Sequence, residues 1–164
     1  MERVSDMRTI FIHVGYHKTA TTFLQKSIYP KLKNVNYIKK GRIKKELRHL
    51  RIKKLSDMEI ENMRNYFMSF NNGQPFLISY EGLSGSPFAP KKTKKQLTIL
   101  KDLRRVFPAS DFDVHVIVGI REQVQLLTSL YIQYIHHGGV RSGRDYITYC
   151  EYNGSVSNFH FHKY

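Results

Sequence analysis

The segment that most constrains this 164-residue chain is an apolar run that leads into a glycine, a lysine and several hydroxyl side chains. The run covers residues 9–14, and residues 15–22 then read Gly-Tyr-His-Lys-Thr-Ala-Thr-Thr. An amphipathic stretch follows and predicts a helix over about residues 21–29. This order is typical of a strand, an anion-binding loop and a helix, because backbone N–H groups at such a helix start can point at a phosphate or sulfate. Lys18 adds a positive charge, and the threonine hydroxyls can donate hydrogen bonds.

The spacing of this loop differs from that of nucleotide triphosphatases. Their loop reads G-x-x-x-x-G-K-[ST], whereas here the lysine comes three residues after a single glycine. The segment resembles instead the 5′-phosphosulfate loop of sulfotransferases, in which a lysine precedes Ser/Thr-Gly-Thr-Thr. Those enzymes take a sulfonate group from 3′-phosphoadenosine 5′-phosphosulfate (PAPS). The resemblance implies that the whole loop binds this donor: Gly15, Tyr16, His17, Lys18, Thr19, Ala20, Thr21 and Thr22.

The loop departs from the family pattern at Ala20, where the family has glycine. If the position requires a positive φ, an alanine there is strained. If the position is helical, alanine costs nothing. The sequence leaves both conformations open.

A second segment carries the other half of the resemblance. Residues 114–120 read Val-His-Val-Ile-Val-Gly-Ile and predict a fully buried strand that leads directly into Arg121. Sulfotransferases bind the 3′-phosphate of the donor with an arginine at a strand end and a serine eight residues later, and Arg121 and Ser129 have that spacing. Arginine suits this role because its planar fork can bind two phosphate oxygens. Since one donor has to contact both Lys18 and Arg121, we expect the strands before them to be neighbours in the sheet.

The rest of the chain alternates between predicted helices and strands. Residues 76–80 predict a short strand, and residues 56–59 form a capping box that starts a helix. Strands separated by helices imply a parallel sheet with helices on both faces. We therefore expect one α/β domain over residues 1–164, with a P-loop-like three-layer fold. The apolar faces of two helices are expected to comprise Ile60, Met63, Phe67 and Phe70 in one and Leu97, Leu100, Leu103 and Phe107 in the other.

The resemblance extends from the first loop through Tyr131. Full sulfotransferase domains are longer, and a later segment rich in glycine and basic residues closes over the nucleotide. No segment of this chain matches that one. We therefore expect a domain that lacks its C-terminal part, binds nucleotide weakly and turns over slowly or not at all by itself.

A candidate general base follows the strand at residues 76–80. Glu81 and the residues around it resemble the S-E-G-L segment of bacterial sulfotransferases, with Tyr80 between the serine and the glutamate. In the family, a histidine or glutamate near the donor sulfur removes the proton of the acceptor, and a positioned carboxylate can do this. A surface glutamate that caps a turn is the other interpretation. Glu46 and His17 remain alternative bases.

The charge of the chain is strongly positive, with 27 lysines and arginines against 13 acidic residues. Most of the excess lies in residues 31–54 and 91–105, where solvated helix faces are one interpretation. A positive field that attracts an anionic donor and an anionic acceptor is another. We expect no nucleic-acid partner, because the chain shows neither a recognition helix nor a basic-aromatic sheet pattern.

Other features exclude several classes of site. The single cysteine, Cys150, excludes an internal disulfide and favours a reducing compartment, so we expect a cytoplasmic protein. No apolar run approaches the ~20 residues of a membrane-spanning helix. The histidine pairs near residues 136 and 160 lack further ligands at metal-site spacing, and no predicted strand ends in the acidic residue that holds magnesium in nucleotide triphosphatases. We therefore expect no bound metal.

Together these features favour a sulfotransferase that moves a sulfonate group from PAPS to a hydroxyl or amine. Lys18 and Glu81 are the expected catalytic residues, and the acceptor is expected to be a small molecule or a carbohydrate. A P-loop kinase with an altered loop is one alternative. A non-catalytic basic module that binds nucleic acid or anionic polysaccharide is the other. The nucleotide separates these hypotheses, because only a 3′-phosphate requires Arg121 and Ser129.

Overall fold

A computed structural model describes residues 7–15, 18–70, 72–84 and 96–152. These residues form an α/β fold with a four-stranded, all-parallel sheet and six helices. The strands are β1 (Arg8–His13), β2 (Asn36–Ile38), β3 (Phe76–Ser79) and β4 (Phe112–Ile117), in the sheet order β2-β3-β1-β4. The helices are α1 (Thr21–Phe23), α2 (Lys40–Ile52), α3 (Asp57–Met68), α4 (Gln96–Val106), α5 (Gln123–His136) and α6 (Gly143–Tyr152).

The pairing of β1 with β4 confirms that the two strands before Lys18 and Arg121 are neighbours. Their register runs from Arg8 opposite Phe112 to His13 opposite Ile117. On its other side β1 pairs with β3, from Ile10 opposite Phe76 to His13 opposite Ser79. Because all strands are parallel, the segments after β1, β3 and β4 leave the sheet at the same edge, where open α/β sheets bind ligands.

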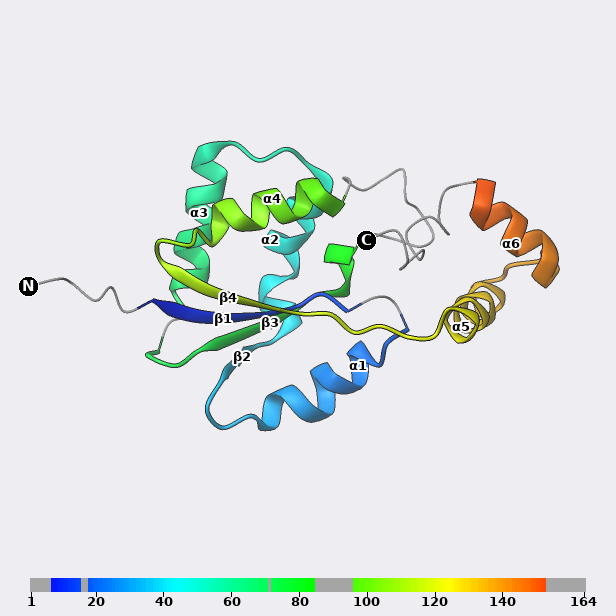
Figure 1. Cartoon of the computed structure of the whole chain (residues 1–164), viewed down its shortest axis with the longest axis horizontal. Helices are drawn as coiled ribbons and strands as arrows, with labels where there is room; N and C mark the ends of the chain where they lie inside the picture. Colours follow the sequence, from blue (N-terminus) through cyan, green and yellow to red (C-terminus); the bar gives the residue numbers. More distant parts are fainter. Residues whose placement is uncertain (1–6, 16–17, 71, 85–95, 153–164) are drawn as a thin grey trace, which may run out of the picture.

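The helices divide between the two faces of the sheet (Figure 1). Helices α2, α3 and α4 lie on one face, and the helical segment that starts with α1 lies on the other. That segment continues from α1 as a π-helical turn, Leu24–Ile28, and a 3₁₀ turn, Tyr29–Lys31. Helices α5 and α6 lie beyond the carboxyl ends of the strands, away from the sheet.

The hydrophobic core lies between the sheet and helices α2, α3 and α4. Phe67 of α3 packs on Phe107, with ring centroids 5.2 Å apart, and Phe107 also contacts Phe112 at the start of β4. All three rings are at most 2% exposed. The predicted capping box is present, since Ser56 and Glu59 cap the first turn of α3 reciprocally. The apolar face predicted for this helix is confirmed: Ile60, Met63, Phe67 and Phe70 are buried.

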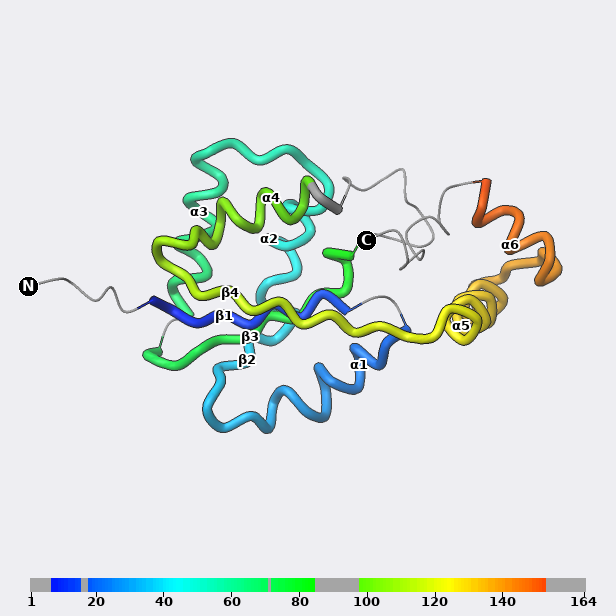
Figure 2. Tube along the Cα trace, viewed as in Figure 1, coloured from blue at the N-terminus to red at the C-terminus, as the bar shows by residue number. Residues whose placement is uncertain are grey.

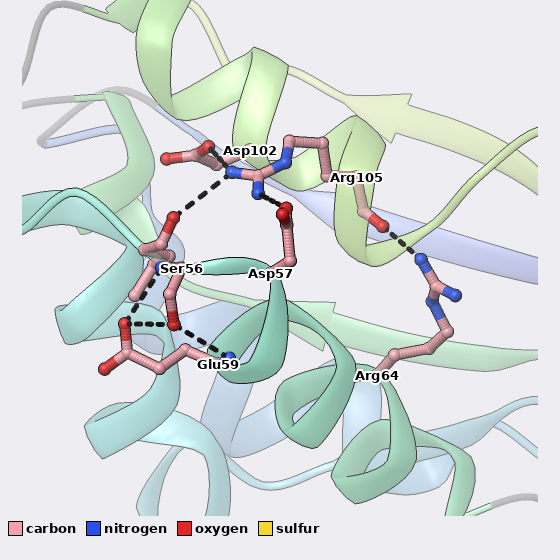
Figure 3. A network of polar contacts seen from close by, with 7 residues as sticks. Ser56, Asp57, Glu59, Arg64, Asp102 and Arg105 are labelled. Atoms are coloured by element: carbon pink, nitrogen blue, oxygen red, sulfur yellow. Dashed lines mark hydrogen bonds and ion pairs between the residues drawn. The ribbon is translucent and has the colours of Figure 1, made fainter.

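A polar network at the rim of this core joins α3 to α4 (Figure 3). The Arg105 guanidinium on α4 forms ion pairs with Asp57, in the first turn of α3, and with Asp102, 3.0 Å away. In return, Arg64 of α3 donates to the carbonyl oxygens of Arg105, at 2.6 Å, and Val106, at 3.2 Å. The helices are therefore held in register by charged contacts as well as by packing.

The prediction of a fully buried strand at residues 114–120 was wrong in both the burial and the ends of the strand. Strand β4 covers Phe112–Ile117, and its second half is exposed: the exposed fraction is 51% for Val116 and 40% for Ile117. The cause is its place at the edge of the sheet, which leaves one side without a strand neighbour among the described residues.

Three smaller expectations also need correction. Leu100 is 49% exposed and does not belong to the buried face of α4, whereas Ile99 and Val106 do. The helical segment expected over about residues 21–29 continues to Lys31 in the 3₁₀ turn. Strand β2 was missed, because its three residues, Asn36–Ile38, carry no alternating pattern.

No helix in the described ranges is long and apolar enough to cross a membrane.

Candidate functional site

The loop after β1 has an unusual backbone. Lys18 and Ala20 both have positive φ, 67° and 60°, and no other non-glycine residue in the described part of the chain does. Ala20 is in the left-handed helical region and occupies the position before the first residue of α1, where its carbonyl oxygen accepts from Leu24 N at 3.0 Å. The position at which the loop differs from the sulfotransferase pattern therefore favours glycine, and alanine is strained there. Tyr16 and His17 lie outside the described residues.

Two glycines allow this loop to approach the segment after β4. A Cβ atom on Gly119 would lie 3.0 Å from Thr19 Oγ1 and 3.7 Å from the Cα atom of Gly15. A Cβ atom on Gly15 would also lie 3.0 Å from Thr19 Oγ1. The Thr19 side chain thus packs against both glycines. Larger residues at either position would force the two loops apart.

Arg121 connects the two loops directly. Its Nη1 donates to the carbonyl oxygen of Lys18 at 3.3 Å, and its Nε donates to Gln125 Oε1 at 3.4 Å. The next residue, Glu122, caps α5 by accepting from the backbone N–H groups of Val124 and Gln125. These backbone hydrogen bonds, followed by the charge of Arg121, lower the pKa of Glu122. Figure 2 shows the chain leaving β1 and β4 at the same edge before it enters α1 and α5.

A cavity of about 700 Å³ lies where these segments meet. It contains three cationic side chains, Lys18, Lys26 and Arg121, and one carboxylate, Glu81, so it suits an anionic ligand. Of the predicted site residues, the structure brings these to the cavity: Lys18, Ala20, Thr21, Thr22, Glu81, Arg121 and Ser129. Sequence reasoning missed the remaining lining residues: Phe23, Lys26, Ser27 and Gln133.

Glu81 begins the 3₁₀ turn η3 (Glu81–Ser84), directly after β3 and Tyr80. Its Oε1 pairs with Lys40 Nζ of α2 at 2.8 Å, and the same ammonium lies 5.5 Å from the centre of the Tyr80 ring. The other oxygen, Oε2, is buried and has no hydrogen-bond partner among the described residues. One oxygen of Glu81 is thus held in place while the other is free to accept a proton or hydrogen bond.

The alternative base Glu46 lies elsewhere. It lines a separate cavity of about 250 Å³ between α2 and α3, with His49 and Tyr66. The structure therefore does not bring Glu46 together with Lys18 and Arg121. The second alternative, His17, is outside the described residues.

The larger cavity is lined by polar and cationic groups that can bind an anion. Thr21 Oγ1 is buried and lacks a hydrogen-bond partner in the described residues, so it is available to a ligand oxygen. Lys18 and Arg121 enter from different strand ends, and Ser129 lies on α5 one helical turn before Gln133, which also lines the cavity. The cavity thus places two cationic groups from separate segments of the chain side by side.

A buried polar network supports the floor of the site. His13, at the end of β1, and Ser79, at the end of β3, are each 1% exposed, and His13 Nδ1 lies 2.8 Å from Ser79 Oγ. Gln25 Nε2 donates to Ser79 Oγ at 3.0 Å and to the Ser79 carbonyl oxygen at 3.1 Å. The network joins the strand before the loop, the strand before Glu81 and the helical segment after the loop. It was missed because an isolated histidine in an apolar run and a helical glutamine carry no specific signal.

Burial affects the protonation of His13, the titratable imidazole of this network. Desolvation lowers the pKa of His13 from its ordinary value of 6.5, although the negative charge of Glu81 acts in the opposite direction. The imidazole also lies directly beneath the loop, since a Cβ on Gly15 would approach its Nε2 to 2.7 Å. Its ring also packs against the Tyr29 ring in a T-shaped pair, with centroids 5.6 Å apart, and burial raises the pKa of Tyr29. A neutral His13 is therefore the form that this structure favours.

No family model, curated protein or solved structure significantly matches this chain. Among the described residues, no group of three histidine, cysteine or acidic side chains is arranged to hold a metal ion.

Replacing Ala20 with glycine tests the left-handed loop position. We expect Ala20→Gly to raise the free energy of unfolding by about 0.5–1 kcal/mol, because relief of left-handed strain exceeds the added chain entropy of glycine. Ala109→Gly is the matched control, since Ala109 has no positive φ, and it should destabilise the protein. Urea unfolding of both variants measures the difference. If Ala20→Gly destabilises the protein as much as the control does, the backbone at Ala20 is not strained.

The pH dependence of stability tests the buried His13. Because its pKa is lower in the folded state, the unfolded state binds more protons, so stability is present above pH ~6.5 and is lost as pH falls toward the lowered value. His13→Asn keeps a group that can bond Ser79 but does not titrate. We expect the variant to lose less stability than the unmodified protein between pH 7.5 and 5.5 in urea unfolding. His137→Asn, at an exposed histidine, is the control; an unchanged pH slope in His13→Asn would contradict the burial effect.

Proposed function

We propose that this chain binds PAPS and transfers its sulfonate group to a hydroxyl or amine of an acceptor. One observation carries the proposal: Lys18 and Arg121, from loops 103 residues apart, line one cavity together with Ser129. The sulfotransferase resemblance assigns these residues to the two ends of one donor molecule. Their convergence in space supports that assignment, because nothing in either local motif requires the two to meet.

In this proposal the two loops bind different parts of the donor. Lys18, Thr21 and Thr22 hold the 5′-phosphosulfate, with the N–H groups at the start of the α1 segment. Arg121 and Ser129 hold the 3′-phosphate, beyond the carboxyl end of β4. The parallel sheet with helices on its two faces supports a P-loop-like three-layer fold for this arrangement. The hydrogen bond from Arg121 to the Lys18 carbonyl keeps the arginine at the cavity.

The chemistry depends mainly on charge and position. The donor supplies the sulfonate group and leaves as 3′,5′-adenosine bisphosphate, while the acceptor oxygen or nitrogen forms the new bond to sulfur. Lys18 neutralises the negative charge that grows on the leaving phosphate. Glu81 accepts the proton of the acceptor on Oε2, while Lys40 holds Oε1 at 2.8 Å. Positioning of this kind lowers a barrier without covalent chemistry by the protein.

Nucleotide selectivity tests the proposed donor. By titration calorimetry, we expect 3′,5′-adenosine bisphosphate to bind at least about tenfold more tightly than AMP, since a charged hydrogen bond contributes about 1.5–3 kcal/mol. Arg121→Ala should remove the difference. Arg104→Ala is the matched control, because Arg104 is exposed and lines a different cavity. Equal affinity for AMP and the bisphosphate in the unmodified protein would reject the donor, and preference for ATP would favour the kinase alternative.

The substitution Glu81→Gln tests whether Glu81 is the general base. The amide keeps the shape of the carboxylate but cannot take a proton, so we expect the variant to lose the slow sulfonate transfer of the unmodified protein while its bisphosphate affinity stays within about twofold. The assay pairs PAPS with a panel of hydroxyl acceptors and quantifies the bisphosphate released in their presence. Glu46→Gln is the control at the separate cavity. Full activity in Glu81→Gln would exclude Glu81 as the base.

A further inference from the structure

A stripe of basic side chains runs along α2. Lys40, Lys44, Arg48 and Arg51 recur at intervals of three or four residues. At 3.6 residues per turn, these four positions fall within an arc of about 80° on the helix surface. We call them the basic stripe. The buried face of α2 lies to one side of it and comprises Ile43, Leu47 and Leu50.

Both ends of the basic stripe are anchored at the segment that carries Glu81. Lys40 Nζ pairs with Glu81 Oε1 at 2.8 Å. At the other end the Arg51 guanidinium lies against Gly82, since a Cβ atom there would be 2.8 Å from its Nη1. The basic stripe therefore follows the turn after β3, and its first member touches the carboxylate that lines the cavity.

The two middle residues of the basic stripe, Lys44 and Arg48, are exposed, and their positive charges are not neutralised by an ion pair among the described residues. The only acidic residue in α2 is Glu46, which lines the separate cavity between α2 and α3. Four residues of helix separate Lys44 from Arg48 by about 6 Å along the axis. Adjacent negative groups on an extended ligand can contact both side chains.

We propose that the acceptor is a polyanionic carbohydrate whose carboxylate or sulfate groups bind Lys44 and Arg48 while its reacting hydroxyl reaches Glu81. This proposal rests on the proposed sulfonate transfer, because the transfer requires a hydroxyl or amine beside Glu81. A carbohydrate chain that carries uronate or sulfate groups supplies hydroxyls and regularly spaced negative charges together. A single-stranded nucleic acid fits less well, because α2 has no tyrosine, phenylalanine or tryptophan on which bases could stack.

Binding of defined oligosaccharides tests the basic stripe. The probes are a fluorescent oligomer of alternating glucuronate and N-acetylglucosamine, its carboxyl-reduced neutral counterpart, and a single-stranded oligonucleotide of equal charge. The variant is Lys44→Gln/Arg48→Gln. Its matched control is Lys33→Gln/Lys101→Gln, which removes the same charge from exposed positions outside α2. Fluorescence anisotropy measures affinity, and circular dichroism verifies that each variant is folded.

We expect the stripe variant to bind the acidic oligosaccharide about tenfold more weakly, and the control variant to change by less than about twofold. The neutral oligosaccharide should bind poorly to all proteins. Equal losses in both variants, equal binding of the neutral probe, or tighter binding of the oligonucleotide would overturn the proposal.

The same variants separate this proposal from the donor assignment. Bisphosphate affinity should be unchanged in the stripe variant, because Lys44 and Arg48 do not line the donor cavity. If the unmodified protein fails to bind the bisphosphate, the proposed transfer fails. If it binds the bisphosphate but the acidic oligosaccharide does not depend on Lys44 and Arg48, only the acceptor proposal fails.

Discussion

The candidate site depends on one constraint, the parallel pairing of β1 with β4. The register that places His13 beside Ile117 brings the two following loops out at one edge of the sheet. The loops then approach closely, because Gly15 and Gly119 have no side chains and Thr19 packs against both. Without that approach, the Arg121 guanidinium could not reach the Lys18 carbonyl 103 residues away in the sequence. The joint lining of one cavity by Lys18 and Arg121 follows from this contact.

A second constraint fixes the acidic residue relative to the cations. Strand β1 also pairs with β3, so Glu81 leaves the sheet at the same edge as Lys18. The buried hydrogen bonds of His13 and Gln25 to Ser79 connect both strands to the helical segment after the loop. A buried polar network of this kind is stabilising only when its members are paired, and these pairs are made within the site itself. Glu81 and the loop that carries Lys18 therefore rest on the same buried network.

Features that are encoded within a few neighbouring residues could be predicted from the sequence. Features that depend on tertiary contacts, such as the exposure of a strand, could not. The capping box at Ser56 and the strand–loop–helix order around Lys18 are encoded within a few residues, so they could be predicted. The neighbouring positions of β1 and β4 followed from requiring one ligand to contact two motifs. The exposure of β4 could not be predicted, because an apolar run has the same pattern at the edge of a sheet as at its centre. Lys40 was hidden within a basic block, and only the fold brings it to Glu81.

The loop shows how strain and function are connected here. Lys18 and Ala20 both adopt left-handed backbone conformations, which side chains with a Cβ atom disfavour by roughly 1–2 kcal/mol each. Such a conformation persists only where surrounding contacts determine it, and this loop has them on both sides. Arg121 binds the Lys18 carbonyl, and Ala20 accepts the first hydrogen bond of the following helical segment. The Arg121 guanidinium, which lines the cavity, thus also stabilises the backbone conformation of Lys18, so any ligand that draws Arg121 away from the carbonyl removes a contact that the strained loop relies on.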